Sequence, residues 1–169
     1  MSDTFITAMS IMVMVILIFF VSILSIVNQN DEITQTSVEA IIANFVNTVA
    51  REGKITPDSY DDFIQKLYAT GNSYDINIEV QIMHNNVINN NEKTIGENIY
   101  YSIFKNEIES KLNNGESYKL KQGDRIIVKT KNNNVTFGTQ LKNFIYSIAQ
   151  KDTIVIEATN SALVTTNGK

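Results

Sequence analysis

The chain has 169 residues, a formal net charge of −4 and no cysteine. This length fits one domain with a smaller appendage. The acidic balance argues against a nucleic-acid partner, since phosphate binding requires a basic surface, and without cysteine the sequence has no disulfide, thiolate metal site or cysteine nucleophile.

After a short tail at 1–7, the first predicted element is a transmembrane helix over Ala8–Val27, with the sequence AMSIMVMVILIFFVSILSIV. The segment has no charge and no polar stripe, and its helix would be about 30 Å long, the thickness of a bilayer's hydrocarbon core. A cleaved secretory signal is the alternative, but such signals have a basic start and a small-x-small cleavage site. MSDTFIT has no Lys or Arg, so we expect a permanent single-pass anchor in the cell membrane.

The side chains expected to contact lipid or other helices are Ile11, Val15, Ile18, Phe19, Phe20, Ile23 and Val27. Orientation is usually set by Lys and Arg beside the span, and the first such residue here is Arg51. The short N-terminal tail leads us to expect that the C-terminal domain is extracellular.

The helix is predicted to continue over residues 28–52 with one apolar face. The members of this packing face recur at the spacing of an amphipathic helix and are Val38, Ile41, Ile42, Phe45, Val46 and Val49. Because Gly53 is the first Gly or Pro of the chain, we favour one helix from about Phe5 to Glu52. The alternative is two helices with a kink near Asn28–Asp31, where Asn and Asp are poor helix formers.

Residues 53–169 are predicted to form an α+β domain. ITPDSYDDFIQKLYATG is typical of a helix that is capped by Thr56 and starts with Pro57. Its expected buried face consists of Tyr60, Phe63, Ile64, Leu67 and Tyr68. YDINIEVQIM alternates strictly and predicts a strand with Ile76, Ile78, Val80 and Ile82 on the core side.

The rest of the domain is predicted from weaker patterns. We expect a helix over IGENIYYSIFKNEIESKLNNG, then a hairpin or a bent strand around Gly123-Asp124. FGTQLKNFIYSIAQ predicts a short helix, and TIVIEATNSALVTTNG predicts two strand segments with a turn near Asn160. The expected architecture is a mainly antiparallel sheet packed on the long helix, with short helices.

No catalytic, cofactor-binding or metal site is predicted. His84 is the single histidine and has no second His or Cys as a partner. The acids at Asp58, Asp61 and Asp62 lack the spacing of a calcium loop and are better explained as charges at a helix N-terminus. We therefore expect a protein that is not an enzyme.

In layout, nearly the whole chain resembles the pilin class, and specifically the TadE-like pseudopilins of tight-adherence (Tad-like) pilus systems, which have small relatives on mobile elements of Gram-positive bacteria. The matching segments follow the apolar span and are IIANFVNTVAREGKIT, YDDFIQKLYATG, YDINIEVQI, GDRIIVKT and IVIEATNSALV. Pilins typically have a basic leader and a glutamate at the fifth mature position. This chain departs from them, because it has no acid between Asp3 and Asp31.

The resemblance implies a pilin-like fold and a structural or accessory subunit of a surface filament or of a secretion or conjugation apparatus. Ala8–Val27 would be its anchor and assembly helix, and Val38–Val49 its packing face. The expected partners are the membrane and further copies or other pilin-like subunits. The alternative function is a single-span, membrane-anchored extracytoplasmic binding protein that does not polymerise.

Overall fold

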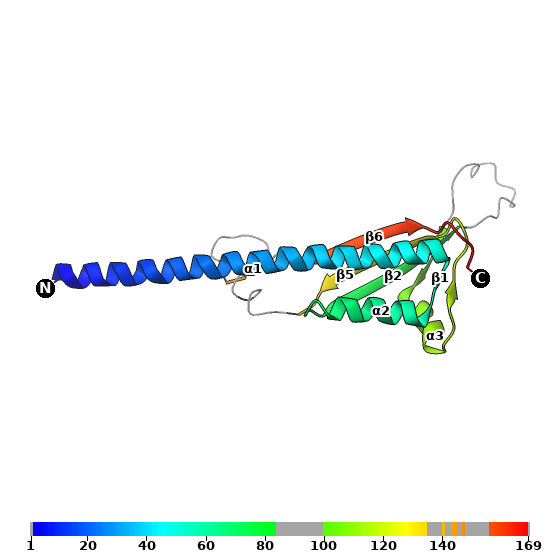
Figure 1. Ribbon diagram of the computed structural model, residues 1–169, viewed down its shortest axis with the longest axis horizontal. Helices are drawn as coiled ribbons and strands as arrows, with labels where there is room; N and C mark the ends of the chain where they lie inside the picture. The colour runs from blue at the N-terminus through cyan, green and yellow to red at the C-terminus, as the bar shows by residue number, and fades with distance from the viewer. Residues whose placement is uncertain are drawn as a thin grey trace. The chain divides into compact units, whose positions relative to one another are not determined.

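The computed structural model describes residues 2–83, 100–134, 140, 143, 144, 147 and 156–168. Its elements, in chain order, are α1 (Ser2–Glu52), β1 (Lys54–Ile55), α2 (Pro57–Tyr68), β2 (Tyr74–Met83), β3 (Tyr100–Phe104), α3 (Lys105–Asn113), β4 (Tyr118–Lys119), β5 (Arg125–Asn132) and β6 (Glu157–Leu163) (Figure 1). This confirms a long N-terminal apolar helix with a small antiparallel sheet and short helices.

The described residues belong to two compact units. The first contains the residues up to Thr34 and the described positions between 135 and 154. The second contains Gln35 to Asn134 and the C-terminal segment from Ile156. Helix α1 contributes to both units, because the boundary between them falls within it.

Helix α1 is helical at every residue from Ser2 to Glu52. The prediction of one helix is confirmed, although the helix begins at Ser2 rather than near Phe5. The chain keeps its helical conformation at Asn28–Asp31, so the helix is not interrupted there. At the C-terminal end, Gly53 has a φ of 69° and donates its N–H to the Val49 carbonyl at 2.8 Å, the geometry of a glycine helix stop.

Helix α2 has a complete N-terminal capping box. The Thr56 side chain accepts the Ser59 N–H at 3.1 Å, and the Ser59 hydroxyl accepts the Thr56 N–H at 3.0 Å. These bonds satisfy two backbone donors that a helix start leaves open. Phe63 and Leu67 are buried as predicted, but Tyr68 is 53% exposed, so its placement in the buried face is wrong.

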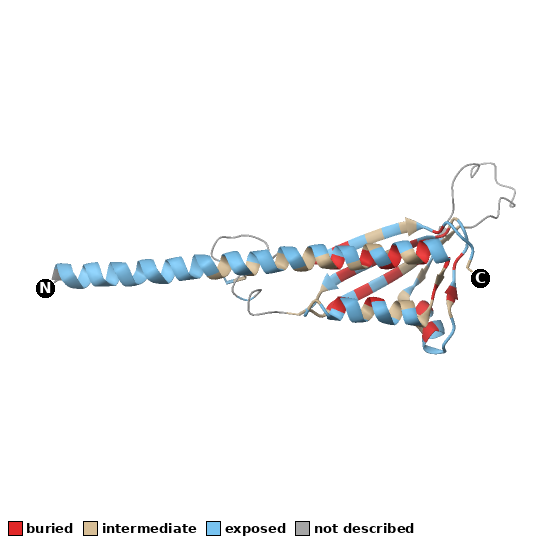
Figure 2. Ribbon diagram, in the orientation of Figure 1, coloured by how far each residue is buried: buried red, intermediate tan, exposed pale blue. Residues whose placement is uncertain are grey.

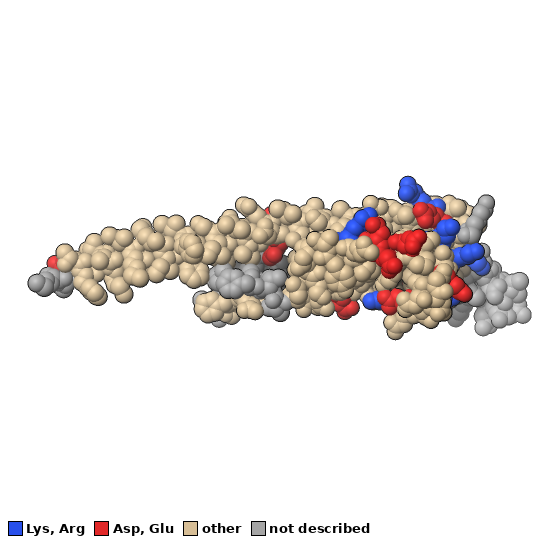
Figure 3. Space-filling view, turned by 60° about the horizontal axis from the view of Figure 1, so that its bottom comes forward, with Lys and Arg blue, Asp and Glu red and all other residues tan. Residues whose placement is uncertain are grey.

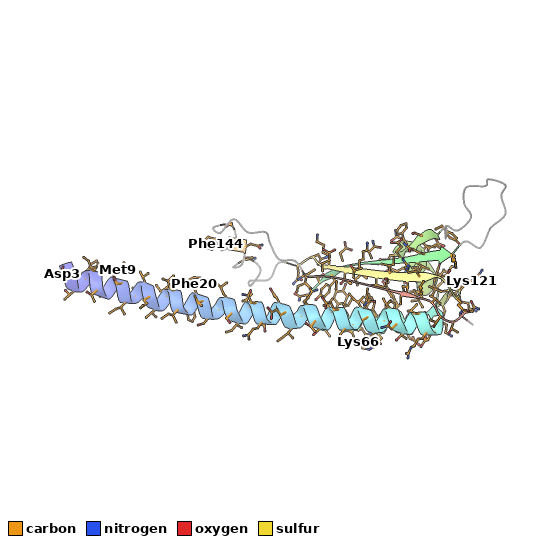
Figure 4. All side chains as sticks on the ribbon, turned by 90° about the horizontal axis from the view of Figure 1, so that it is seen from above. Asp3, Met9, Phe20, Lys66, Lys121 and Phe144 are labelled. Atoms are coloured by element: carbon orange, nitrogen blue, oxygen red, sulfur yellow. The ribbon has the colours of Figure 1, made fainter. Side chains whose placement is uncertain are left out.

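The second unit contains two antiparallel sheets. The larger sheet has the strand order β3-β2-β5-β6, and the smaller one pairs β1 with β4. In the larger sheet, the apolar side chains of β2 and the facing residues of β5 lie on one side, because side chains alternate along a strand. That side is covered by the C-terminal part of α1, as Figures 1 and 4 agree, and by α2, whose Phe63 and Leu67 belong to the same core.

The hydrophobic core lies between this sheet face and the two helices. Figure 2 shows the buried residues on the inner faces of α1, α2 and the strands. Phe45 of α1 and Phe63 of α2 stack with ring centroids 4.3 Å apart. This stacking joins the two helices directly over the sheet.

The C-terminal segment closes the end of α1. Thr165 donates its N–H to the Ala50 carbonyl at 2.9 Å, and Gly168 donates to the Leu120 carbonyl at 3.0 Å. Leu120 in turn donates to the Gly53 carbonyl at 2.7 Å. A Cβ atom on Gly53 would lie 2.2 Å from the carbonyl oxygen of Thr166, so glycine is required there by its φ and by the close approach of the tail.

Three predicted elements need correction. In the segment 95–115, predicted as one helix, the described residues from Tyr100 form the strand β3 followed by α3, because residues 100–104 pair with β2. The predicted hairpin at Gly123-Asp124 does not form, since β4 pairs with β1 and β5 pairs with β2 and β6. The predicted turn at Asn160 lies within one continuous strand, β6.

The predicted helix over residues 137–150 lies mostly outside the described residues. Its four described positions, 140, 143, 144 and 147, are helical. His84 also lies outside the described residues.

Candidate membrane and assembly surface

The N-terminal half of α1 presents apolar side chains that no other described residue buries. Among the predicted assembly residues, Ile11, Val15, Ile18, Phe19 and Phe20 are exposed, and Ile23 and Val27 are partly covered. In Figure 4 the side chains of this half, Met9 and Phe20 among them, project on both sides of the helix. A water-soluble helix would show a polar stripe instead.

Three hydroxyl side chains in this half are bonded within the helix. The hydroxyls of Thr7, Ser10 and Ser22 donate to the carbonyls four residues earlier, at 2.8 to 3.0 Å. A hydroxyl bonded in this way needs no water, so it can lie in hydrocarbon without an unpaired donor. Among the described residues, α1 is the one helix long and apolar enough to cross a membrane.

The C-terminal half of α1 is buried along one face. Val38, Ile42, Val46 and Val49 are fully buried, and Phe45 is nearly so, while Ile41 lies at the rim of the core and is partly buried. At the start of this half, the Gln35 amide donates to the Glu157 carbonyl at 3.0 Å. One face of this half therefore packs on the chain's own sheet.

A shallow groove runs between α1 and α2. Its volume is about 240 Å³, and its rim includes Asn44, Thr48, Asp62 and Lys66. Lys66 already pairs with Asp62 at 2.6 Å. The groove is smaller than the usual small-molecule site, which encloses roughly 300–1,000 Å³, and its charges neutralise each other.

The charged side chains of the second unit are mixed in sign. Lys131 of β5 lies in register between Asp75 of β2 and Glu157 of β6 on the outer sheet face. The Ser102 hydroxyl, the Gln81 amide and the charge of Lys129 lower the pKa of Glu79. On the face drawn in Figure 3, Lys and Arg residues stand among Asp and Glu residues. The described residues of this face form no one-signed patch for a polyelectrolyte.

The remaining polar groups of note have structural explanations. The buried Asp124 carboxylate accepts the Lys121 N–H at 2.7 Å and the Met83 N–H at 3.1 Å, which fixes the turn before β5. The Tyr60 hydroxyl donates to Glu109, and burial together with this bond raises the pKa of Tyr60. Of the predicted helix-start acids, Asp58 lies in the first turn of α2. Across the described part of the chain, no three His, Cys, Asp or Glu residues are grouped as a metal site.

Comparisons with protein-family models, with curated proteins and with solved structures give no match for this chain.

Proposed function

We propose that this chain is a pilin-like structural or accessory subunit of a surface filament or of a secretion or conjugation apparatus. Its N-terminal apolar helix anchors it in the membrane and assembles it with other subunits. The observation that carries this proposal is the division of one helix into an exposed apolar half and a half that is buried on a globular domain.

The exposed half needs a partner outside the chain, and two environments supply one. Twenty apolar residues cross a bilayer as a helix of about 30 Å. The same side chains can pack against helices of other copies, where van der Waals contact and small residues drive association. A subunit that exchanges lipid for neighbouring helices uses both environments in turn.

The role we propose is structural and not catalytic. The described groove between α1 and α2 is small and its charged rim residues pair with each other. The buried Asp124 carboxylate has backbone partners that fix a turn. This arrangement also favours a subunit over an anchored binding protein, which needs a concave site with converging polar groups.

The proposal is tested by shearing surface material from cells that express the chain and labelling it with an antibody to the globular domain for negative-stain electron microscopy. We expect labelled filaments or labelled filament bases. A matched variant, Ile18→Asp, places a charge in the exposed half and should abolish labelling while the domain keeps its fold. Antigen that stays wholly in the membrane fraction, with no labelled structure on the cell surface, would contradict the proposal.

A further inference from the structure

In the described structure the larger sheet has two edge strands, β3 and β6. At the two ends of β6 the Glu157 carbonyl and the Thr165 N–H bond to α1, so the unpaired stretch of this edge is limited to the residues between them. Natural sheets block their edges with charged side chains, proline or bulges. Strand β3 has the sequence Tyr-Tyr-Ser-Ile-Phe, and β6 from Ala158 to Leu163 has no charge and no proline. Within the described residues, neither strand pairs with another on its outer side.

The backbone of β6 points toward this open edge at alternate residues. Asn132 donates to the Ile156 carbonyl and Val164 donates to the Asp124 carbonyl, at 2.8 Å each, and these two pairs bracket the register of β5 with β6. Hydrogen-bonded pairs alternate along an antiparallel ladder, so the N–H and C=O groups of Thr159, Ser161 and Leu163 point outward. These three residues are also exposed.

The topology makes the two edges complementary under simple sideways repetition. Every pairing in the order β3-β2-β5-β6 is antiparallel, so β3 runs opposite to β6. A second copy in the same orientation, shifted by the width of four strands or about 19 Å, would lay its β3 antiparallel to the first copy's β6. The two helices over this sheet, each about 10 Å across, cover a similar width and repeat with it.

Two copies that are anchored in the same membrane have the same orientation relative to it. Strand β6 runs parallel to the C-terminal half of α1, since Gln35 bonds to Glu157 at one end and Ala50 bonds to Thr165 at the other. A two-fold pairing of β6 with β6 would therefore reverse this half of one helix relative to the other. Pairing β6 with β3 keeps both copies in one orientation.

The sheet registers also bring together two exposed apolar side chains. One cross-strand row of the sheet contains Phe104, Glu79, Ile127 and Ser161. The next row on the same face of the sheet begins with Ser102 of β3 and ends with Leu163 of β6. Repeating these rows sets Ser161 opposite Phe104 of the next copy, and Leu163 opposite Ser102. Phe104 is 56% and Leu163 is 52% exposed, and as diagonal neighbours they would cover each other.

We infer that β6 of one copy adds to β3 of the next copy, which extends the antiparallel sheet from subunit to subunit. This inference rests on the proposed function, because it supplies the contact between subunits outside the apolar helix. It names a second copy of this chain, held in the same orientation, as the partner of both edges.

Cysteine cross-linking tests the inference directly, because the chain has no cysteine. The full chain is expressed with Ser102→Cys and Leu163→Cys together, with each change alone, and with the pair Ser102→Cys and Asn77→Cys as a control, and membranes are treated with a short bifunctional maleimide. Asn77 lies on the outer face of the central strand β2 and is exposed. Thermal melting checks that each variant keeps the fold of the parent.

We expect a ladder of dimers, trimers and higher multiples from the first pair only. Dimers from Leu163→Cys alone would indicate a two-fold β6 contact and would overturn the inference. The absence of a ladder from the first pair would also overturn it, as would a ladder of equal intensity from the control pair.

A charge variant gives an independent readout. Ser161→Lys places a charge on the β6 edge, which disfavours pairing with another strand. In the double-cysteine background it should reduce the cross-linked multimers by about tenfold. The control Asn77→Lys should leave them unchanged. An unchanged ladder with Ser161→Lys overturns the inference. Filaments without the ladder would reject edge pairing alone, and a ladder without any surface structure would reject the proposed subunit function but retain edge pairing.

Discussion

The two halves of α1 have similar apolar residues in opposite surroundings. Ile18 is 62% exposed, whereas Ile42 on the same helix is fully buried. The second half packs on the chain's own sheet, so its apolar face is part of the folding of the domain. The first half has no such partner among the described residues, and under the proposed function its partner is lipid or another subunit.

Alanine substitutions at these two isoleucines should separate the two roles most strongly. Ile42→Ala removes buried methyl groups and leaves a cavity, so the free energy of unfolding of the domain should fall by about 3 kcal/mol. Ile18→Ala should change it by less than about 0.5 kcal/mol. Urea unfolding of the detergent-solubilised chain measures both values. Equal losses of unfolding free energy in the two variants would contradict the distinction between the two halves of α1.

The end of the buried half should be the next most sensitive point. Gly53→Ala combines a positive φ of 69° with a Cβ position 2.2 Å from a carbonyl oxygen, so we expect a loss of about 3 kcal/mol. Gly71→Ala is the matched control, because Gly71 has a φ of 82° but nothing within 4 Å of the Cβ position. Its loss should be about 1 kcal/mol. If the two variants lost equal stability, the closure by the C-terminal segment would contribute nothing.

A smaller effect of opposite sign is expected in the core under the buried half. The Thr130 hydroxyl is buried and has no hydrogen-bond partner in the described structure. Thr130→Val removes this unpaired group at nearly constant shape, so stability should rise by about 1 kcal/mol. The melting temperature of the variant checks this, and a decrease would indicate that the hydroxyl has a partner such as an ordered water.

A further effect is confined to alkaline pH and to the domain. Burial, with smaller contributions from Glu107, Tyr101 and Asp124, raises the pKa of Tyr118 to about 12. In the unfolded chain this pKa is about 10, so the folded state binds the proton more tightly. The contribution of protonated Tyr118 to the free energy of unfolding is present below about pH 10 and is lost as the pH rises toward about 12.

Comparison of the parent with Tyr118→Phe isolates this contribution. The parent should lose more stability than the variant between about pH 10 and about pH 12. Parallel losses would mean that Tyr118 titrates normally in the folded domain. The apolar half should not contribute, because Ala8–Val27 has no ionisable side chain.

A periodic pattern of apolar residues was sufficient to predict the elements that repeat one spacing over many residues. Helix α1, the capped helix α2 and the alternating strand β2 were predictable because each repeats one spacing over many residues. The division of residues 100–113 into β3 and α3 was not, since Ile103, Ile108 and Leu112 also fit one helix. The strand is instead favoured by five residue pairs with β2, and such a long-range contact leaves no local signal.

Short or weakly apolar strands also escaped prediction. β4 has only two residues, too few for any period, and its pairing with β1 depends on the fold. In β6 the inward positions include Ala158 and Ala162, so the alternation is faint and also fits a turn at Asn160. The apolar half of α1 was predictable from composition alone, whereas the open sheet edges became visible only with the strand order.

The most direct test of a helix divided between two environments is single-cysteine labelling along α1 in membranes. A membrane-impermeant maleimide is applied to Ile11→Cys, Ile18→Cys, Ile33→Cys and Ile42→Cys, before and after denaturation. Ile33 is 65% exposed, and it lies between the apolar span and the packing face. We predict labelling at position 33 alone in native membranes, labelling at position 42 only after unfolding, and protection at positions 11 and 18 as long as the membrane or the assembly is intact. Labelling of positions 11 and 18 in native membranes would contradict the account, because the apolar half would then lie in water.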